Sequence, residues 1–265
     1  MVLMHYSFHA LTDTGLVRTN NEDALLFDEP CGVAVLADGM GGYNAGEIAA
    51  GMATTYLKTE LVNWLSAEGG HLTAGQTAQA IATTVEQANL SILNAANVAP
   101  HYFGMGTTVV VGIFRGTKLV LGHVGDSRCY RLRNGVLEQI TKDHSMLQEQ
   151  VDAGLLSMEQ AAFAPGRNLL TRALGVDPAM KVEIHEHEVK DADLYLMCSD
   201  GLSDMVNDGE IVMMLQAHSE LPLMAQALVS LANKLGGRDN VSVLLVRAEA
   251  MAGKPGLISR IFGKP

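Results

Sequence analysis

The sequence predicts an α+β protein whose helices pack on antiparallel strands, and two observations carry that prediction. Short apolar runs are joined by tight turns: Arg128–Leu132 and Val136–Ile140 flank Asn134-Gly135, a dipeptide typical of two-residue hairpins. Longer segments with apolar residues at helical spacing lie on either side of these runs. Because hairpins join antiparallel strands, a parallel nucleotide-binding sheet is disfavoured. No repeat or linker divides the chain, so we expect one domain over residues 1–248.

The N-terminal third of the chain predicts three strands and two helices. The strands are expected at His5–Ala10, Ala24–Phe27 and Val33–Ala37. Capping pairs predict the two helix starts, Asn44 with Glu47 and Thr73 with Gln76. The apolar stripes expected to pack on the sheet are Ile48, Met52, Tyr56, Leu61 and Leu65 in the first helix, and Ile81, Val85, Ala88 and Ile92 in the second.

The middle of the chain predicts strands at Thr107–Phe114 and Leu119–Val124, before the hairpin described above. The segment from about residue 143 to 175 differs, because it contains helix starts at Ser145 and Ser157 rather than strands. A helical insertion between strands often forms a flap over a site. We therefore expect a mobile flap over a site here.

The C-terminal third begins with an alternating strand, Val182–Val189, that places Glu183, His185 and His187 on one face. Two histidines so spaced can bind a metal ion, but a solvated face is the favoured interpretation. The remaining elements are expected as strands at Leu194–Cys198 and Val241–Val246 and helices at Glu210–Ala217 and Leu221–Leu235. Residues 249–265 end in a stretch rich in Gly, Lys and Pro and are expected to form a flexible tail.

Composition and charge exclude several classes of function. Hydrophobic residues make up 48% of the 265 residues and aromatic residues only 5%, so the core is aliphatic. A net charge of −11, from 18 basic and 29 acidic residues, repels phosphate backbones and argues against nucleic-acid binding. No apolar run reaches membrane-spanning length, so no membrane partner is expected.

The cysteines and the N-terminus indicate the compartment. Cys31, Cys129 and Cys198 are odd in number and are expected to be free thiols in a reducing environment. None is followed by Arg six residues on, which excludes the loop of cysteine-nucleophile phosphatases. The N-terminus lacks the basic region and apolar run of a secretory signal. We therefore expect a cytoplasmic protein, and a monomer.

Five aspartates recur beside small or flexible residues at the ends of predicted strands. Asp38, Asp126 and Asp200 follow apolar runs, whereas Asp23 and Asp239 precede them. If neighbouring strands alternate in direction, these ends meet at one edge of the sheets. A single Asp-Gly after a strand is an ordinary turn, so the recurrence is what points to a site.

Carboxylates gathered in this way need cations. Two of them about 4 Å apart repel by roughly 4 kcal/mol at an effective dielectric constant near 20. Ligands that are all oxygen favour Mg²⁺ or Mn²⁺ over Zn²⁺. Two such ions can share a water, lower its pKa and direct it at phosphorus. Arg18, on the loop before Asp23, offers a bidentate fork for a phosphate group.

Six motifs, in order along the chain, carry a resemblance to a known family. They are Arg18-x-x-Asn21-Glu22-Asp23, Asp38-Gly39-Met40-Gly41-Gly42, Gly104-Met105-Gly106-Thr107-Thr108, Val124-Gly125-Asp126-Ser127-Arg128, Ser199-Asp200-Gly201 and Arg238-Asp239-Asn240. Together they resemble the metal-dependent serine/threonine protein phosphatases of type 2C, in their short bacterial form. The match extends from about the first strand to about Val246, and the ordered set of glycine-flanked aspartates is highly specific.

The resemblance implies a fold and a ligand set. The fold is a four-layer α/β/β/α sandwich, with two central antiparallel sheets flanked by helices. The groups implied to hold two Mn²⁺ or Mg²⁺ ions are Asp23, Asp38, the Gly39 carbonyl, Asp200 and Asp239. Glu22 would reach these ions through water, and Asp126, with Asp200, would take part in a third, weaker metal site. Arg18 would bind the substrate phosphate.

The resemblance also implies an activity, the hydrolysis of phosphoserine and phosphothreonine on proteins by direct attack of a metal-bridging hydroxide. A bacterial serine/threonine kinase is the expected partner, and Arg18, Asp38, Asp200 and Asp239 are the expected catalytic residues. One departure is Met40, which stands where many eukaryotic relatives carry the His assigned as general acid. Because Met40 cannot donate a proton, our hypothesis is that a metal-bound water at the Asp126 site protonates the leaving group.

Two alternatives stay open. A relative that has lost catalysis would be a regulatory or binding module, although such loss usually shows as missing carboxylates. A phosphatase of a phosphorylated transcription regulator, in a partner-switching pathway, would share the fold and metals, but the intact Arg18 loop argues for the general protein phosphatase. An aspartate-nucleophile phosphatase is excluded, because Tyr195 follows Asp191-x-Asp193 where Thr or Val is expected. The sequence names neither the substrate nor the kinase, and it leaves the choice between Mn²⁺ and Mg²⁺ open.

Overall fold

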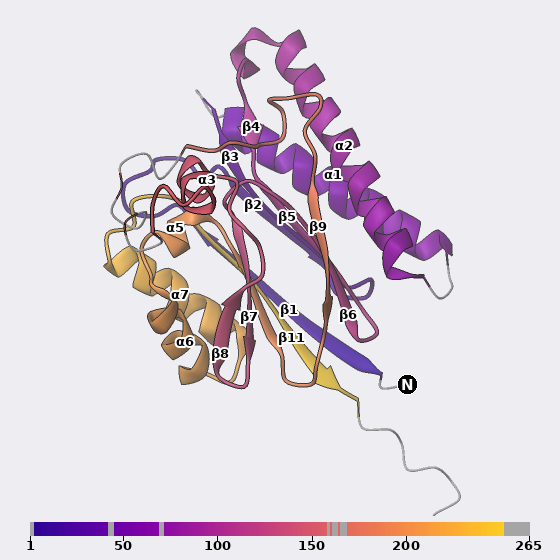
Figure 1. The fold of residues 1–265 in the computed structure, drawn as a ribbon, viewed down its shortest axis with the longest axis vertical. Helices are drawn as coiled ribbons and strands as arrows, with labels where there is room; N and C mark the ends of the chain where they lie inside the picture. Colours follow the sequence, from indigo (N-terminus) through magenta and orange to yellow (C-terminus); the bar gives the residue numbers. More distant parts are fainter. Residues whose placement is uncertain are drawn as a thin grey trace, which may run out of the picture.

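The computed structural model describes residues 3–41, 45–68, 72–157, 160, 164 and 169–251. Across these residues two antiparallel sheets pack face to face, and helices cover both outer faces (Figure 1). Helices α1 and α2 lie on one side of the strands, and α6 and α7 lie on the other. The predicted α/β/β/α sandwich is therefore confirmed.

Each sheet is a series of antiparallel pairs. The first sheet has the strand order β1-β11-β10-β7-β8, where β1 is Met4–Asp13, β11 Val241–Ala250, β10 Leu194–Cys198, β7 Arg128–Arg133 and β8 Val136–Gln139. The second has the order β2-β3-β5-β6-β9, where β2 is Asp23–Asp28, β3 Val33–Met40, β5 Val109–Arg115, β6 Lys118–Val124 and β9 Glu183–Glu188. Strand β4, Gly106–Thr107, pairs with the end of β3.

The helical segments follow one another along the chain in this order. They are α1 Ala45–Glu68, α2 Ala74–Val98, the 3₁₀ turn η1 Pro100–Tyr102, α3 Met146–Asp152, α5 Asp200–Ser203, α6 Asp208–Ala217 and α7 Leu221–Lys234. Within the described part of the chain, no helix is both long enough and apolar enough to cross a membrane.

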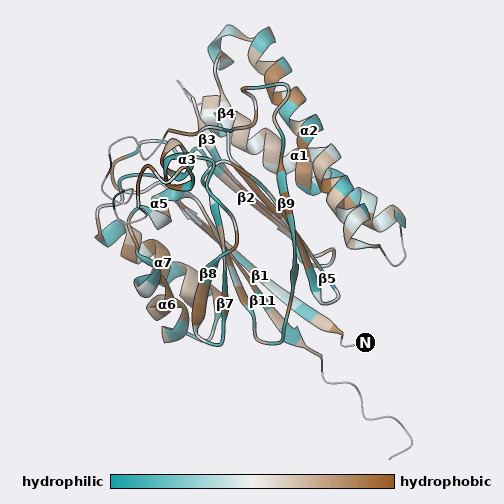
Figure 2. Cartoon of the chain, in the orientation of Figure 1, coloured by the Kyte–Doolittle hydropathy of each residue, from teal (hydrophilic) through white to brown (hydrophobic). Residues whose placement is uncertain are grey.

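Three hydrophobic clusters fill the spaces between the four layers. One joins α1 and α2 to the second sheet and includes Leu57 and Val111. Another joins α6 and α7 to the first sheet and includes Leu228. The third lies between the sheets, where the rings of Phe114 and Tyr195 meet edge to face at 5.2 Å. Figure 2 shows hydrophobic residues concentrated on the central strands and polar residues on the outer helix surfaces.

Helix α1 buries a different face from the one predicted. Leu61 and Leu65 are buried as expected, but Ile48, Met52 and Tyr56 are only partly buried. The buried face of its first turns consists of small residues, Ala45, Gly46, Ala49, Ala50 and Ala53. The prediction relied on large apolar side chains at helical spacing. It missed this face because a helix that lies close to a strand needs small side chains there.

Helix α2 and the β7–β8 hairpin are as predicted. Thr73 and Gln76 form the capping box, with hydrogen bonds of 2.9 and 3.2 Å between side chain and main chain. The predicted stripe is buried at Ile81, Val85, Ala88 and Ile92. Asn134 and Gly135 have φ angles of 51° and 79°, which suit a type I′ turn. Asn44, predicted to cap the first helix, lies outside the described residues.

Two strands near the predicted site differ from expectation. The strand expected at Thr107–Phe114 is broken at Thr108, which separates β4 from β5. The strand expected at Val33–Ala37 continues past Asp38, because its last two residues pair with β4. Asp38 therefore lies inside a strand rather than in the turn after it.

The insertion expected at about 143–175 leaves the first sheet after β8. Ser145 caps α3 by accepting a hydrogen bond from the Gln148 N–H, and Ser157 and Gln160 exchange bonds of the same kind. A bridge between Ser145 and Leu170 joins the outgoing and returning chain. Part of this insertion lies outside the described residues, as do residues 252–265 of the tail predicted at 249–265. The first residues of that tail, Glu249 and Ala250, instead belong to β11 and pair with β1.

Candidate metal centre

The five recurring aspartates lie at one end of the sandwich. Asp23 opens β2 and pairs across the second sheet with Asp38 of β3. Asp200 begins α5 directly after β10, and Asp239 precedes β11, the neighbour of β10. Asp126 follows β6, whose end pairs with the start of β5. Antiparallel pairing thus brings together side chains that are far apart in the sequence.

The charges of these aspartates act on one another. Burial raises the pKa of Asp38 well above its ordinary value, and the charges of Asp23, Asp200, Asp126 and Asp239 raise it further. Burial also raises the pKa of Asp200, with the charge of Asp126 the next largest cause. Carboxylates in this arrangement cannot all be ionised at low cost without a positive counter-charge.

Asp23 and Asp126 are shifted in the same direction. Burial raises the pKa of Asp23 to about 6, although hydrogen bonds from Ser242 and Ser199 act in the opposite sense. Burial, followed by the charge of Asp143, raises the pKa of Asp126 to about 6. Oδ1 of Asp23 is buried and has no hydrogen-bond partner. A hard divalent cation would satisfy this oxygen and offset the excess negative charge, so the residues present fit Mn²⁺ or Mg²⁺.

Hydroxyl groups hold the main chain of Asp38. Oγ1 of Thr108 accepts a hydrogen bond of 3.0 Å from the Asp38 N–H, and Oγ1 of Thr107 donates to the Asp38 carbonyl at 2.9 Å. Oγ of Ser127 lies 2.7 Å from Oγ1 of Thr108. The break in the strand at Thr108 frees this side chain to join the Asp38 strand to the Asp126-Ser127 loop. No role for these hydroxyls could be predicted from the sequence.

Asp23 and Glu22 are held from the first sheet. Oγ of Ser199 donates to Oδ2 of Asp23 at 2.7 Å. Oδ1 of Asn240 accepts from the Glu22 N–H at 2.8 Å, and its Nδ2 donates to the carbonyls of residues 14 and 20 at 3.0 and 2.9 Å. Ser199 and Asn240 were visible in the sequence only as neighbours of the aspartates in their motifs. Their positions show that they orient the loop before β2.

Close packing requires glycine at position 39. A Cβ there would lie 2.1 Å from the Gly46 carbonyl oxygen and 2.6 Å from that of Glu22. The Gly39 N–H donates to the same Glu22 carbonyl at 3.1 Å. The first turn of α1 therefore lies directly against the end of β3. At this point the main chain, rather than a side chain, is what Gly39 can offer to a ligand.

Arg18 lies at the edge of the site. Its Nη2 donates to Oδ2 of Asp239 at 2.6 Å, and its side chain is 53% exposed. Burial raises the pKa of Glu22, and the charge of Arg18 partly offsets that effect. A guanidinium tied to Asp239 and open to solvent is well placed to meet an anion that enters the site.

One group of histidine and carboxylate side chains could also hold a metal ion. Among the described residues, the group of three whose ligand atoms all lie within 4.8 Å of one another is His123, His144 and Glu183. His185 and His187, considered in the sequence as a metal-binding pair, do not form such a group in this part of the chain.

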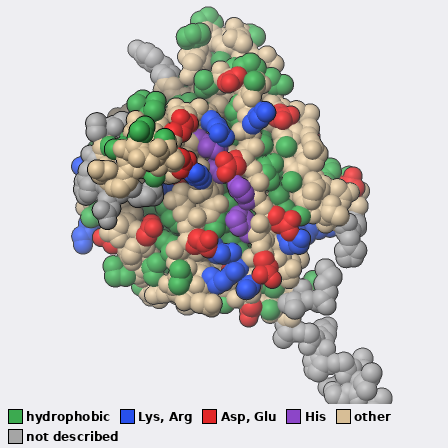
Figure 3. Space-filling view, in the orientation of Figure 1, with side chains coloured by type: hydrophobic (Ala, Val, Ile, Leu, Met, Phe, Trp, Pro, Cys, Tyr) green, Lys and Arg blue, Asp and Glu red, His purple; other side chains and the backbone are tan. Residues whose placement is uncertain are grey.

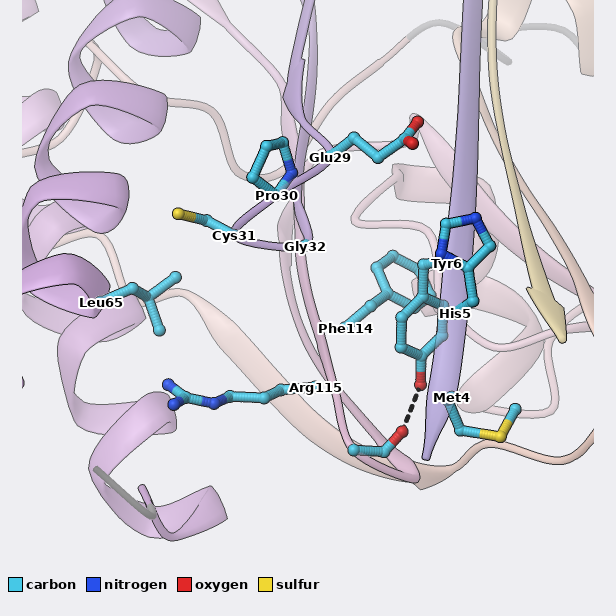
Figure 4. Close-up of a pocket in the computed structure, with 11 residues that line it drawn as sticks. Met4, His5, Tyr6, Glu29, Pro30, Cys31, Gly32, Leu65, Phe114 and Arg115 are labelled. Carbon is cyan, nitrogen blue, oxygen red and sulfur yellow. Dashed lines mark hydrogen bonds between the residues drawn. The ribbon is translucent and has the colours of Figure 1, made fainter. Parts of the chain in front are cut away.

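A cavity of about 480 Å³ lies at the other end of the sandwich (Figure 4). Residues from the start of β1, the β2–β3 turn and the β5–β6 turn line it, and the Tyr6 hydroxyl donates to the Gly116 carbonyl at 2.8 Å. These are the strand ends opposite to Asp23 and Asp38. Glu29 is the carboxylate in its lining, so this cavity lacks the charge cluster of the aspartate end.

Comparisons with known proteins show the family of the chain. The family model described as protein phosphatase 2C matches residues 17–235. The chain is 37% identical over 255 residues to the serine/threonine phosphatase stp of Listeria innocua, which covers 94% of this chain and 97% of that protein. It is 40% identical over 244 residues to the serine/threonine protein phosphatase PstP of Mycobacterium tuberculosis, which covers 90% of this chain and 44% of PstP.

Solved structures share the fold. The crystal structure of the Mycobacterium tuberculosis phosphatase PstP is similar with a TM-score of 0.82 and 38% identity, over 92% of this chain and 99% of that one. The catalytic domain of PstP in complex with two manganese ions is similar with a TM-score of 0.80 and 36% identity, over 93% and 99% of the two chains.

Proposed function

This chain belongs to the protein phosphatase 2C family, and from that premise we propose that its five clustered aspartates hold the catalytic metal ions. The protein is a metal-dependent serine/threonine protein phosphatase, a phosphoric monoester hydrolase. The observation that carries the proposal is a set of partly buried carboxylates that repel one another, with the unpartnered Oδ1 of Asp23 among them.

The proposed ligands divide into a core and a periphery. The core groups, for two Mn²⁺ or Mg²⁺ ions, are Asp23, Asp38, the Gly39 carbonyl, Asp200 and Asp239. Glu22 acts from the periphery through water, and Asp126, with Asp200, contributes to a third, weaker site. When bound, the ions supply a water of lowered pKa to attack phosphorus and neutralise charge on the phosphate.

The protein's own side chains prepare the site for this chemistry. Arg18, held by Asp239, binds phosphate oxygens through its fork and orients the phosphorus atom. Thr108 holds the main chain of Asp38, and Ser199 donates to the carboxylate of Asp23, so this part of the site needs little reorganisation when substrate enters. Positioning and charge stabilisation account for most of the catalysis of phosphoryl transfer.

The leaving group needs a proton source other than residue 40. Met40 has no proton to give, and its methyl group lies beside Gly106, where a Cβ would meet it at 2.8 Å. We propose that the Asp126 side of the site supplies this proton. A serine alkoxide is a poor leaving group and needs it, whereas an aryl oxide does not.

Phosphorylated proteins are the substrates of the family, and the finer assignments are proposals. We propose that the protein opposes a serine/threonine kinase, acts as a cytoplasmic monomer, and uses residues 1–248 as one catalytic domain with a flap at about 143–175. Its three cysteines are free thiols, which suits a reducing compartment. No observation favours the two alternatives, an inactive binding module or a phosphatase of a partner-switching regulator.

A phosphatase assay tests the proposal. With an aryl phosphate, we expect wild-type hydrolysis to require Mn²⁺ and Asp200→Asn to lower kcat/KM by on the order of 10²–10³-fold. Asp191→Asn is the matched control, because Asp191 lies before β10 whereas Asp200 lies after it. Asp191 is exposed and accepts a hydrogen bond from the Ala250 N–H. Wild-type activity that does not depend on Mn²⁺, together with unchanged activity in Asp200→Asn, would rule out the proposed centre.

A further inference from the structure

The first residues of the flap form hydrogen bonds on both sides of Asp126, in the loop that carries it. The His144 N–H donates to the Gly125 carbonyl at 2.9 Å, and Nδ1 of His144 accepts from the Gly125 N–H at 3.1 Å. Arg128 donates from Nε and Nη2 to the carboxylate of Asp143, with a shortest distance of 2.7 Å. Asp126 therefore lies between Gly125 and Arg128. Both are held by the first residues of the flap, Asp143 and His144, which we call its root.

The same root holds the returning chain of the flap. The His144 carbonyl accepts from the Thr171 N–H at 2.9 Å, and the Met146 N–H donates to the Leu169 carbonyl at 2.8 Å. His144 thus contacts the Asp126 loop through its ring and N–H, and the far side of the flap through its carbonyl.

The hydrogen bonds assign the tautomer of His144. Because Nδ1 accepts from a main-chain N–H, the neutral ring carries its proton on Nε2, which lies 3.2 Å from Oε2 of Glu183 and donates to it. The ring is 6% exposed, and burial lowers the pKa of His144, which favours this neutral form. Glu183 also accepts from Nε2 of His185 at 2.7 Å. Figure 3 shows histidine side chains in a row on this face, along the line of β9.

This tautomer argues against a metal ion between His123, His144 and Glu183. An imidazole nitrogen binds a metal through its lone pair, and Nε2 of His144 carries a proton. Nδ1 of His123 is buried without a partner, but its ring stacks on that of His144 at 4.8 Å and adds a single nitrogen. Arg172 places a cation beside the group, with Nη1 3.3 Å from Nε2 of His144. These residues support the His144 ring instead.

We propose that His144 is a positioning residue for Asp126. It joins the loop that carries Asp126 to both the first and the returning residues of the flap. The proposal rests on the role of Asp126 proposed above. Only glycine fits at position 125, because its φ is 102° and a Cβ would lie 2.6 Å from Cγ2 of Thr108. Without the ring acceptor, its buried N–H loses a partner, and the loop shifts to find another.

Two substitutions separate the two ends of the ring. His144→Asn keeps an acceptor near the position of Nδ1 and loses the donor to Glu183. His144→Gln keeps a group near Nε2 and loses the acceptor for Gly125. In metal-free protein we expect amide exchange at Gly125 to quicken by about 10-fold in His144→Gln and by less than about 3-fold in His144→Asn.

Activity supplies the second readout. In the loaded enzyme, His144→Gln should lower kcat with a phosphopeptide by about 10-fold and change kcat with an aryl phosphate by less than about 3-fold. Asp126→Asn should show the same split, and the double variant should be no worse than Asp126→Asn alone. His144→Asn should retain the wild-type ratio of the two rates. His185→Asn is the control, because His185 contacts Glu183 and not Gly125.

Equal effects of His144→Asn and His144→Gln on Gly125 exchange would overturn the proposal, since the ring would then only fill space. If His144→Gln does not fold, Glu183→Gln replaces it: this variant should leave Gly125 protected, and loss of protection would count against the assigned acceptor. Absence of metal-dependent activity in the wild type would instead contradict the proposed function, and the exchange experiment would still report on the His144 contact.

Discussion

Strand β10 has an aspartate beside each end, Asp193 buried and Asp200 partly buried, and their surroundings are opposite. Before the strand, the carboxylate of Asp193 accepts from Arg133 at 2.7 and 2.6 Å, from the Lys190 N–H at 2.8 Å and from the Tyr195 hydroxyl at 3.2 Å. After the strand, Asp200 is surrounded by other acidic groups rather than by a partner cation. One strand thus carries a satisfied carboxylate and an unsatisfied one.

The pKa values of the two carboxylates are shifted in opposite directions. For Asp193, burial alone would raise the pKa, but the hydrogen bonds and charge of Arg133 outweigh it, so the pKa is lowered. For Asp200, the neighbouring charges add to burial and raise the pKa. The comparison teaches that a buried carboxylate does not by itself indicate a binding site. A cluster of carboxylates that its neighbouring cation, here Arg18, balances only in part does.

The largest effect is expected at the satisfied end. Asp193→Ala should lower the free energy of unfolding by about 3 kcal/mol, because it leaves the Arg133 guanidinium without its partner. The Asp193 side chain is 0% exposed and that of Arg133 is 21% exposed, so solvent can compensate only in part. Urea unfolding measures the change. The exposed Asp191, as Asp191→Ala, should cost less than about 1 kcal/mol.

The folded fraction of Asp193→Ala should keep the Mn²⁺ requirement of the wild type. An unchanged unfolding free energy, or a lost metal requirement, would remove the distinction between the two ends of the strand.

A smaller effect is expected from pH at the unsatisfied end. Asp23 has a pKa of about 6 in the folded protein, above the ordinary value of about 4 for an unfolded chain. The folded state therefore binds this proton more tightly. The stability it contributes is complete below about pH 4 and is lost as the pH rises through about 6, in total about 2–3 kcal/mol.

Thermal unfolding in EDTA, from pH 4 to pH 7 or so, measures this term as the difference between wild type and Asp23→Asn. The wild type should lose stability relative to the variant as pH rises, and added Mn²⁺ should cancel the loss. Parallel pH profiles in EDTA would show that Asp23 is not an unsatisfied carboxylate.

The aspartates could be predicted from the sequence, because each stands beside small residues at the end of an apolar run. Such a pattern involves only neighbouring residues, so it can be recognised without knowing the fold. It also predicts the antiparallel sheets, since the Asn134-Gly135 turn specifies a hairpin locally. The strand break at Thr108 was not predicted, because β-branched and apolar residues continue through it.

What the sequence does not contain is the identity of long-range partners. Thr108 meets Asp38 across 70 positions, and Ser199 meets Asp23 across 176. Nothing local distinguishes such a hydroxyl from a solvated one. The small residues at the start of α1 are similar, because their value comes from the strand they approach and not from their own hydrophobicity.

Calorimetric titration of metal-free protein with Mn²⁺ tests the central claim most directly. The wild type and Asp193→Ala should each bind two ions tightly, and Asp200→Asn should bind fewer than two or bind them far more weakly. Equal stoichiometry and affinity in wild type and Asp200→Asn, or no Mn²⁺ binding to the wild type, would contradict the account.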